Sequence, residues 1–209
     1  MSVLMDAAEN ITSLGENGQL HRSKISSKQP TKAHLKCCAM IEKSCSAKYV
    51  KILMDGLLKL GCATSTEQKN IVCEPCTPKL VAAFDTEKNQ IVICENDLSN
   101  QKVMDDVLTH ELIHAYDVCR VKYDLNNLKH LACSSIRVAN LTGDCFFWKE
   151  NFLRFRFGWQ YQQQACVRNM AVKHMMASKK IDEDTARSTV ESVFDACFND
   201  HEPFIRIPP

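Results

Sequence analysis

Apolar residues recur at helical spacing over most of the chain from about residue 34 onward. Between residues 34 and 61 they fall along one face, and Gly61 stands just after the last of them, where a glycine commonly ends a helix. The same spacing predicts four further helices, over residues 101–119, 128–140, 160–178 and 183–198. Asp182 directly precedes the last of these and is a suitable N-cap.

Two short apolar runs interrupt the helical pattern just before residue 101. They are LVAAFD (residues 80–85) and QIVICEN (residues 90–96), joined by the polar segment TEKN. Runs of this length around a short polar connection are typical of a β-hairpin. We therefore predict an α+β fold, mainly helical, with one small β-sheet that precedes the helix over residues 101–119.

The predicted elements fit one domain. The chain has 209 residues, which is enough for one sizeable core. Residues 1–33 are polar, without the apolar core of a secretory signal or the arginine-rich character of a mitochondrial presequence, and predict a disordered leader. Residues 34–203 form the predicted single domain, and the proline-containing residues 204–209 an extended tail.

The charge balance excludes one class of partner. Lysine and arginine total 26 and aspartate and glutamate 25, so no strongly basic face is expected and nucleic acid is not a predicted partner. No apolar run reaches the roughly 18–20 residues that span a bilayer. The aromatic and basic run over residues 146–159 has two interpretations: contact with a membrane interface through Trp148, Trp159, Arg154 and Arg156, or aromatic packing in the core.

Cysteine is unusually frequent, with 12 residues spread over the predicted domain. One interpretation is buried thiols in a reducing compartment. The density and spread favour the other, several disulfides formed in an oxidising compartment. Cys73 and Cys76 form the one CxxC motif, which indicates either a redox pair or, more typically, two cysteines with separate structural partners.

The segment VLTHELIHAYDVCR (residues 107–120) carries the chemistry. His110 and His114 are four residues apart, so on a helix they project side by side and can supply two ligands of a Zn²⁺ ion. Glu111 lies to one side of that face, where it can take a proton from a water on the metal without binding the metal itself. The pattern predicts one zinc per chain, a zincin-like fold and a metalloprotease. Its alternative is a pair of histidines without a metal.

The third ligand is open from the residues alone. Asp117 is on the same helical face, but it is a turn too far and too short, which favours support of a ligand or an ion pair with Arg120. His130 follows a loop that can return it towards the metal. Its alternative is a histidine on a helix surface.

Four segments resemble a mitochondrial intermembrane-space metalloprotease family that matures an ATP-synthase subunit, also described as Ku-binding-protein-like. They are THELIHAYDVCR, NNLKHLACSSIRVANLTGDC, ACVRNMAVKHM and VFDACFNDHEPF, and the likeness runs from about Cys37 to Pro203. The resemblance implies His110 and His114 as metal ligands and Glu111 as the catalytic residue. It also implies trapping in the intermembrane space by the oxidative import machinery, a peripheral position on the inner membrane, and a polypeptide substrate, the ATP-synthase subunit precursor.

One departure from the family stands next to the motif helix. The family usually has ACSEIRA where this chain has ACSSIRV, so Ser135 replaces a habitual glutamate. A glutamate at this distance, on a following helix, is where a third zinc ligand of the gluzincin type falls. The sequence therefore leaves an alternative function, a non-catalytic factor for ATP-synthase assembly on a protease scaffold that has lost a ligand, unless His130 or a water fills the position.

Overall fold

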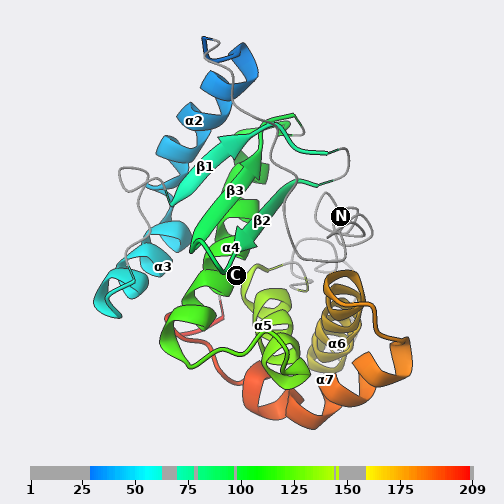
Figure 1. The fold of residues 1–209 in the computed structure, drawn as a ribbon. Coiled ribbons are helices and arrows are strands. Elements are labelled where there is room, and N and C mark those ends of the chain that lie inside the picture. The colour runs from blue at the N-terminus through cyan, green and yellow to red at the C-terminus, as the bar shows by residue number, and fades with distance from the viewer. Residues whose placement is uncertain are drawn as a thin grey trace.

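A computed structural model of the chain describes residues 29–62, 70–77, 80–96, 98–143, 145 and 159–207. The described part is mainly helical, with one three-stranded sheet (Figure 1). This confirms the predicted α+β class. Its elements are α2 (Lys32–Ser44), α3 (Lys48–Lys59), β1 (Ile71–Glu74), β2 (Ala82–Asp85), β3 (Gln90–Cys94), α4 (Gln101–Arg120), α5 (Leu128–Leu141), α6 (Trp159–Ser178) and α7 (Glu183–Phe198).

The sheet has the strand order β1-β3-β2. β2 and β3 form the predicted hairpin, antiparallel with Phe84 opposite Ile91. β1 pairs with β3 in parallel, and the sequence did not predict it. Its four residues, IVCE, are too few to show a period of two and lie in a largely polar stretch. Among the described residues β2 pairs with a neighbour on one side only, so its other side is an open edge of the described sheet.

The helix ends follow the capping chemistry of the sequence. Gly61 has φ +80°, its N–H donates to the Leu58 carbonyl at 3.0 Å, and the Cys62 N–H donates to the Leu57 carbonyl at 2.9 Å. This is the glycine-terminated helix end that the sequence predicted at Gly61. The predicted cap of α7 is also confirmed, since the Asp182 side chain accepts from the Thr185 N–H at 2.8 Å.

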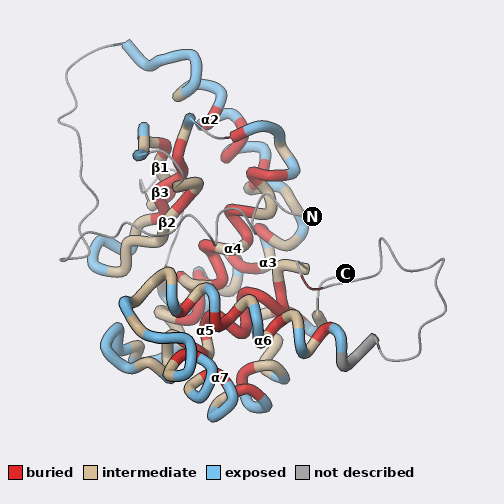
Figure 2. Tube along the Cα trace, turned by 90° about the vertical axis from the view of Figure 1, so that its right-hand side faces the viewer, coloured by how far each residue is buried: buried red, intermediate tan, exposed pale blue. Residues whose placement is uncertain are grey.

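Two clusters of buried side chains meet at α4 and α5. The first lies between the sheet, α2, α3 and α4, and the second between α5, α6 and α7. Figure 2 shows the buried stretches running from the sheet through α4 and into the lower helices. The motif helix therefore has one side in the first cluster and faces the second, so that side chains of α4, α5 and α6 approach one another.

Five disulfides cross-link the described residues. Several disulfides were predicted from the density of cysteines, and this is confirmed. Cys73 and Cys76 do not pair with each other, so the redox interpretation of the CxxC motif is not supported. The pairs are Cys37–Cys73, Cys62–Cys119, Cys76–Cys94, Cys133–Cys197 and Cys145–Cys166, and Cys38 and Cys45 are free thiols.

Some predictions fall at or beyond the limits of the described residues. Residues 1–28 lie outside them, as do Trp148, Arg154, Arg156 and the side chain of Trp159, so the proposed membrane contact through these residues stays a prediction. Phe204, in the predicted tail, is buried and packs edge-on against Tyr49 with ring centroids 6.0 Å apart. None of the helices in the described part has the length and apolar character needed to cross a membrane.

Candidate metal centre

Helix α4 places the two motif histidines on one face. Asn100 caps it, accepting from the Val103 N–H at 3.2 Å, and the apolar positions around the motif are buried against the sheet. The rings of His110 and His114 have centroids 5.1 Å apart, as expected for residues separated by four positions. The two imidazoles thus project side by side.

A third histidine, which the sequence analysis missed, completes the cluster. His174 lies on α6, with its ring centroid 5.0 Å from that of His114 and 5.8 Å from that of His110. One nitrogen from each of the three rings lies within 4.8 Å of the other two. A signal for His174 did exist: it follows Val167 and Ala171 at helical spacing, which puts a polar residue in a buried apolar stripe.

His130, which the sequence offered as a third ligand, lies outside the cluster, whereas Ser135 contacts it. His130 accepts the Asp124 N–H at 3.0 Å through Nδ1 and packs beside Tyr123, outside the histidine cluster. Its placement favours the alternative of a histidine near the start of α5. Ser135, at the position where the family resemblance implies a glutamate, hydrogen-bonds to Nδ1 of His174 at 2.7 Å. This position on α5 is therefore in contact with the third histidine.

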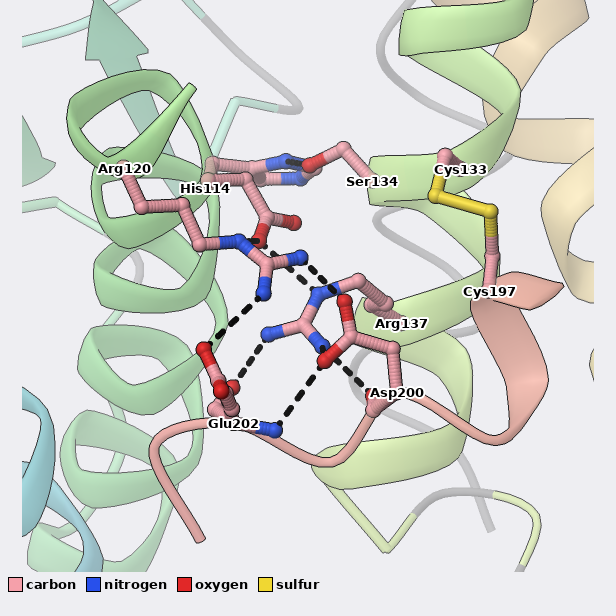
Figure 3. Close-up of polar contacts among 9 residues, drawn as sticks. His114, Arg120, Cys133, Ser134, Arg137, Cys197, Asp200 and Glu202 are labelled. Atoms are coloured by element: carbon pink, nitrogen blue, oxygen red, sulfur yellow. Dashed lines mark hydrogen bonds and ion pairs between the residues drawn. A yellow bond between two sulfur atoms is a disulfide. The ribbon is translucent and has the colours of Figure 1, made fainter.

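Asp117 belongs to a charged network with Arg120 and Arg137, two residues that Figure 3 labels. Its Oδ1 pairs with Nε of Arg137 at 2.8 Å and with Nε of Arg120 at 3.2 Å. Both arginines also bind Asp200 in the segment after α7. The ion pair with Arg120 that the sequence predicted is confirmed, and the network links the C-terminal segment to α4 and α5.

Removing the buried arginine of this network is expected to destabilise the fold. Arg137 is 1% exposed, so Arg137→Met leaves the buried Asp117 with one cation fewer and is expected to lower the free energy of unfolding by about 3–5 kcal/mol. Arg187→Met is the matched control, because its ion pair with Glu183 is on the surface and is worth about 0–1 kcal/mol. Urea denaturation of both variants measures the difference. Equal stabilities would contradict this role for Arg137.

The three imidazoles are in the protonation state that metals require. Burial, together with the neighbouring histidines, lowers the pKa of His110 to about 3 and holds the pKa of His114 well below its usual value, and burial lowers that of His174 to about 4. All three rings are therefore neutral near pH 7, each with one nitrogen lone pair. Nδ1 of His110 and Nε2 of His114 are buried and have no hydrogen-bond partner within the described part of the chain. A cation between the rings satisfies this donor set, and three imidazoles suit Zn²⁺.

Glu111 directly follows His110 on α4, and its side chain contacts β2. It is 8% exposed, and its carboxyl group hydrogen-bonds to the Phe84 backbone N–H in β2. The Cys94 N–H donates to the Val81 carbonyl, so the backbone groups of Val81 and of every second residue after it point towards β3. The backbone N–H of Phe84 therefore points to the open edge. The open edge of β2 is therefore adjacent to Glu111.

The raised pKa of Glu111 predicts a pH dependence in the metal-free protein. Burial raises this pKa from 4.5 to about 8, so the folded state keeps a proton that the unfolded state releases, and the free energy of unfolding falls as the pH rises between these values. The histidines act oppositely up to about pH 7.5, and they do so equally in wild type and in Glu111→Gln. Between pH 6.5 and 8 we expect a loss of about 2 kcal/mol that Glu111→Gln lacks. Urea denaturation after chelation measures it, and an equal loss in the variant would refute it.

The chain matches one protein family and several known proteins over most of its length. A model of the Peptidase M76 family matches residues 35–205. The "Mitochondrial inner membrane protease ATP23 homolog" of Xenopus laevis is 42% identical over 194 residues, covering 92% of this chain and 82% of the frog protein. The human protein of the same name is 45% identical over 161 residues, covering 77% of this chain and 65% of the human protein.

More distant relatives and solved structures were also compared. The "Mitochondrial inner membrane protease atp23" of Emericella nidulans is 38% identical over 160 residues, covering 76% of this chain and 66% of the fungal protein. The matched region thus spans about two thirds of the human and fungal proteins. No solved structure matches the chain.

Proposed function

The chain belongs to the Peptidase M76 family, and we propose that it is a zinc metalloendopeptidase whose metal is held by His110, His114 and His174. The convergence of three neutral imidazoles from α4 and α6 beside a buried carboxyl group carries this proposal. Three protein ligands that leave a fourth position open are the usual arrangement of a catalytic zinc site. The motif histidines supply two of them.

His174 is the proposed third ligand in place of the glutamate that the family resemblance implies at position 135. Ser135 is a poor ligand, but its hydroxyl is 2.7 Å from Nδ1 of His174, so the neighbouring helix offers an imidazole where the family offers a carboxylate. In this proposal the third zinc ligand comes from α6 and not from α5. This favours an active protease over the alternative of an assembly factor with an incomplete metal site.

Glu111 is the proposed catalytic residue. Zn²⁺ bound at the three histidines supplies a Lewis acid that polarises the scissile carbonyl and lowers the pKa of a bound water. Glu111 accepts the proton of the attacking water and delivers it to the leaving amine, so the carboxyl group ends each cycle as it began. Burial keeps its pKa near the operating range, and the Phe84 N–H holds its orientation.

The open edge of β2 is the proposed binding site of the polypeptide substrate. Its outward-facing backbone groups can pair with an extended chain as an added strand. An extended chain along this edge passes Glu111, because Phe84 at the edge contacts that side chain. Backbone pairing holds a polypeptide whatever its side chains, which suits an endopeptidase.

The cellular setting is proposed from the disulfides and the relatives. Five disulfides indicate folding in an oxidising compartment. The relatives are named as mitochondrial inner membrane proteases. We place the protein in the intermembrane space, peripheral to the inner membrane and retained by oxidative folding. Its proposed substrate, by family resemblance, is the precursor of a membrane-embedded ATP-synthase subunit, whose assembly it also assists.

Cleavage of that precursor tests the proposal. Oxidised, purified protein is mixed with inner membranes that contain the unprocessed subunit, before and after treatment with a zinc chelator. We expect a shortened subunit, loss of cleavage after chelation, and recovery when Zn²⁺ is added back. Cleavage that persists in the chelated protein, or a zinc-loaded protein that leaves the precursor intact, would refute the proposed function.

A further inference from the structure

Helix α5 presents two adjacent serines to histidines from two other helices. The Ser134 hydroxyl is 2.8 Å from Nδ1 of His114 on α4, and the Ser135 hydroxyl is 2.7 Å from Nδ1 of His174 on α6. Side chains at adjacent helix positions diverge by about 100°. Because α5 lies between α4 and α6 (Figure 1), Ser134 reaches α4 and Ser135 reaches α6. Both serines are 2% exposed, so these contacts are made away from water.

The hydroxyl hydrogen of Ser135 is already used in another hydrogen bond. Its hydroxyl donates to the Leu131 carbonyl at 2.8 Å, and a carbonyl oxygen can only accept. A serine hydroxyl has one hydrogen, so towards His174 it acts as an acceptor. Nδ1 of His174 therefore carries the proton that it donates to Ser135, and Nε2 keeps its lone pair.

Ser134 is in the same situation. Its hydroxyl also lies beside the Asp117 carboxyl group, which is paired with Arg137 and Arg120 and accepts a hydrogen bond when ionised. The hydroxyl donates to Asp117 and accepts from Nδ1 of His114. Nε2 of His114 then faces the histidine cluster, buried and without a partner in the described part of the chain.

We infer that Ser134 and Ser135 are paired positioning residues, which hold His114 and His174 in the Nδ1–H tautomer and so present both Nε2 lone pairs to one metal ion. The inference rests on the proposed metal site. Neither serine hydrogen-bonds to His110. The serines thus orient the two ligands that face α5, including the ligand from a separate helix.

The tautomers are measured first, in the absence of metal. Nitrogen-15 NMR of the chelated wild-type protein at pH 7 assigns the protonated nitrogen of each imidazole. In wild type we expect the proton on Nδ1 of both His114 and His174. In Ser135→Ala we expect the proton of His174 to be distributed over Nδ1 and Nε2, because the acceptor that holds it on Nδ1 is gone. A proton on Nε2 of either ring in wild type would overturn the inference while leaving the metal site itself open.

A double-mutant cycle with Co²⁺ then separates support of a ligand from general packing. Loss of a hydrogen-bond partner of a metal ligand typically weakens metal binding by about 10–100-fold. We expect this factor for Ser135→Ala in the wild-type background, and less than about threefold in the His174→Ala background, because Ser135 acts through His174. The control is Ser192→Ala, since Ser192 likewise donates to a backbone carbonyl at 2.7 Å but is exposed on α7.

The outcomes distinguish the inference from the function beneath it. Equal factors in the two backgrounds, or an unchanged affinity and Co²⁺ absorption spectrum in Ser135→Ala, would overturn the role of Ser135. Failure of the wild-type protein to bind Co²⁺ would overturn the proposed metal site, and the inference with it. The metal site and the role of Ser135 are both supported if wild type and Ser192→Ala bind Co²⁺ with equal affinity and Ser135→Ala weakens binding only where His174 is present.

Discussion

Replacing Glu111 with glutamine is expected to lower kcat for peptide cleavage by about 10²–10⁴-fold while the bound zinc remains. Glutamine has nearly the same shape and fits the buried site, but its neutral amide cannot take a proton from the attacking water. Glu111 is not one of the three clustered histidines, so metal binding is not expected to depend on it. Cleavage at saturating substrate and the zinc content of the same preparation are measured together.

The control for this variant is Glu42→Gln, the same change at an exposed position on α2. We expect wild-type cleavage from it. If Glu111→Gln cleaved as fast as wild type, the assignment of Glu111 as the proton acceptor would be wrong. If it lost zinc together with activity, Glu111 would be a ligand and not a base.

Replacing His174 with alanine is expected to abolish cleavage and to weaken zinc binding by more than the 10–100-fold typical for loss of a ligand's hydrogen-bond partner. The variant lacks one of the three proposed ligands, and the remaining pair on α4 would leave two positions of a tetrahedral metal open. Adding Ser135→Glu to His174→Ala is expected to restore zinc binding. The Ser135 hydroxyl is 2.7 Å from the imidazole, so a longer carboxylate side chain there enters the volume that the ring leaves.

His130→Ala is the matched control, because His130 is on α5 but outside the cluster. It is expected to bind zinc as wild type does. Equilibrium dialysis against a chelating dye gives the affinities of the four proteins. Zinc binding in His174→Ala equal to that of wild type would exclude His174 as a ligand, and a strong loss in His130→Ala would point to the other histidine.

Local sequence rules predicted the elements that depend on local chemistry. The β2–β3 hairpin, the glycine end at Gly61 and the Asp182 cap each follow from residues a few positions apart. β1 was missed because its pairing with β3 is a parallel contact to a strand nearly twenty residues away, and its own four residues show no pattern. The break between α2 and α3 was not predicted either, since apolar residues continue on both sides of it.

The same distinction explains the site. His110 and His114 are recognised because the geometry of one helix fixes their separation. His174 is brought to them by the packing of α6 against α5, and no spacing rule connects it with α4. The serine at position 135 did raise the question of a different third ligand, but the sequence pointed to His130, which lies nearer in the chain. A histidine within the buried stripe of α6 was the better clue.

The central claim is that three histidines from two helices hold one zinc ion, and the zinc content of the purified, oxidised protein tests it most directly. Elemental analysis is made on wild type and His174→Ala after identical dialysis against trace zinc. The account predicts about one zinc per chain in wild type and a value near zero in His174→Ala. Wild-type protein without zinc, or equal zinc in both proteins, would contradict it.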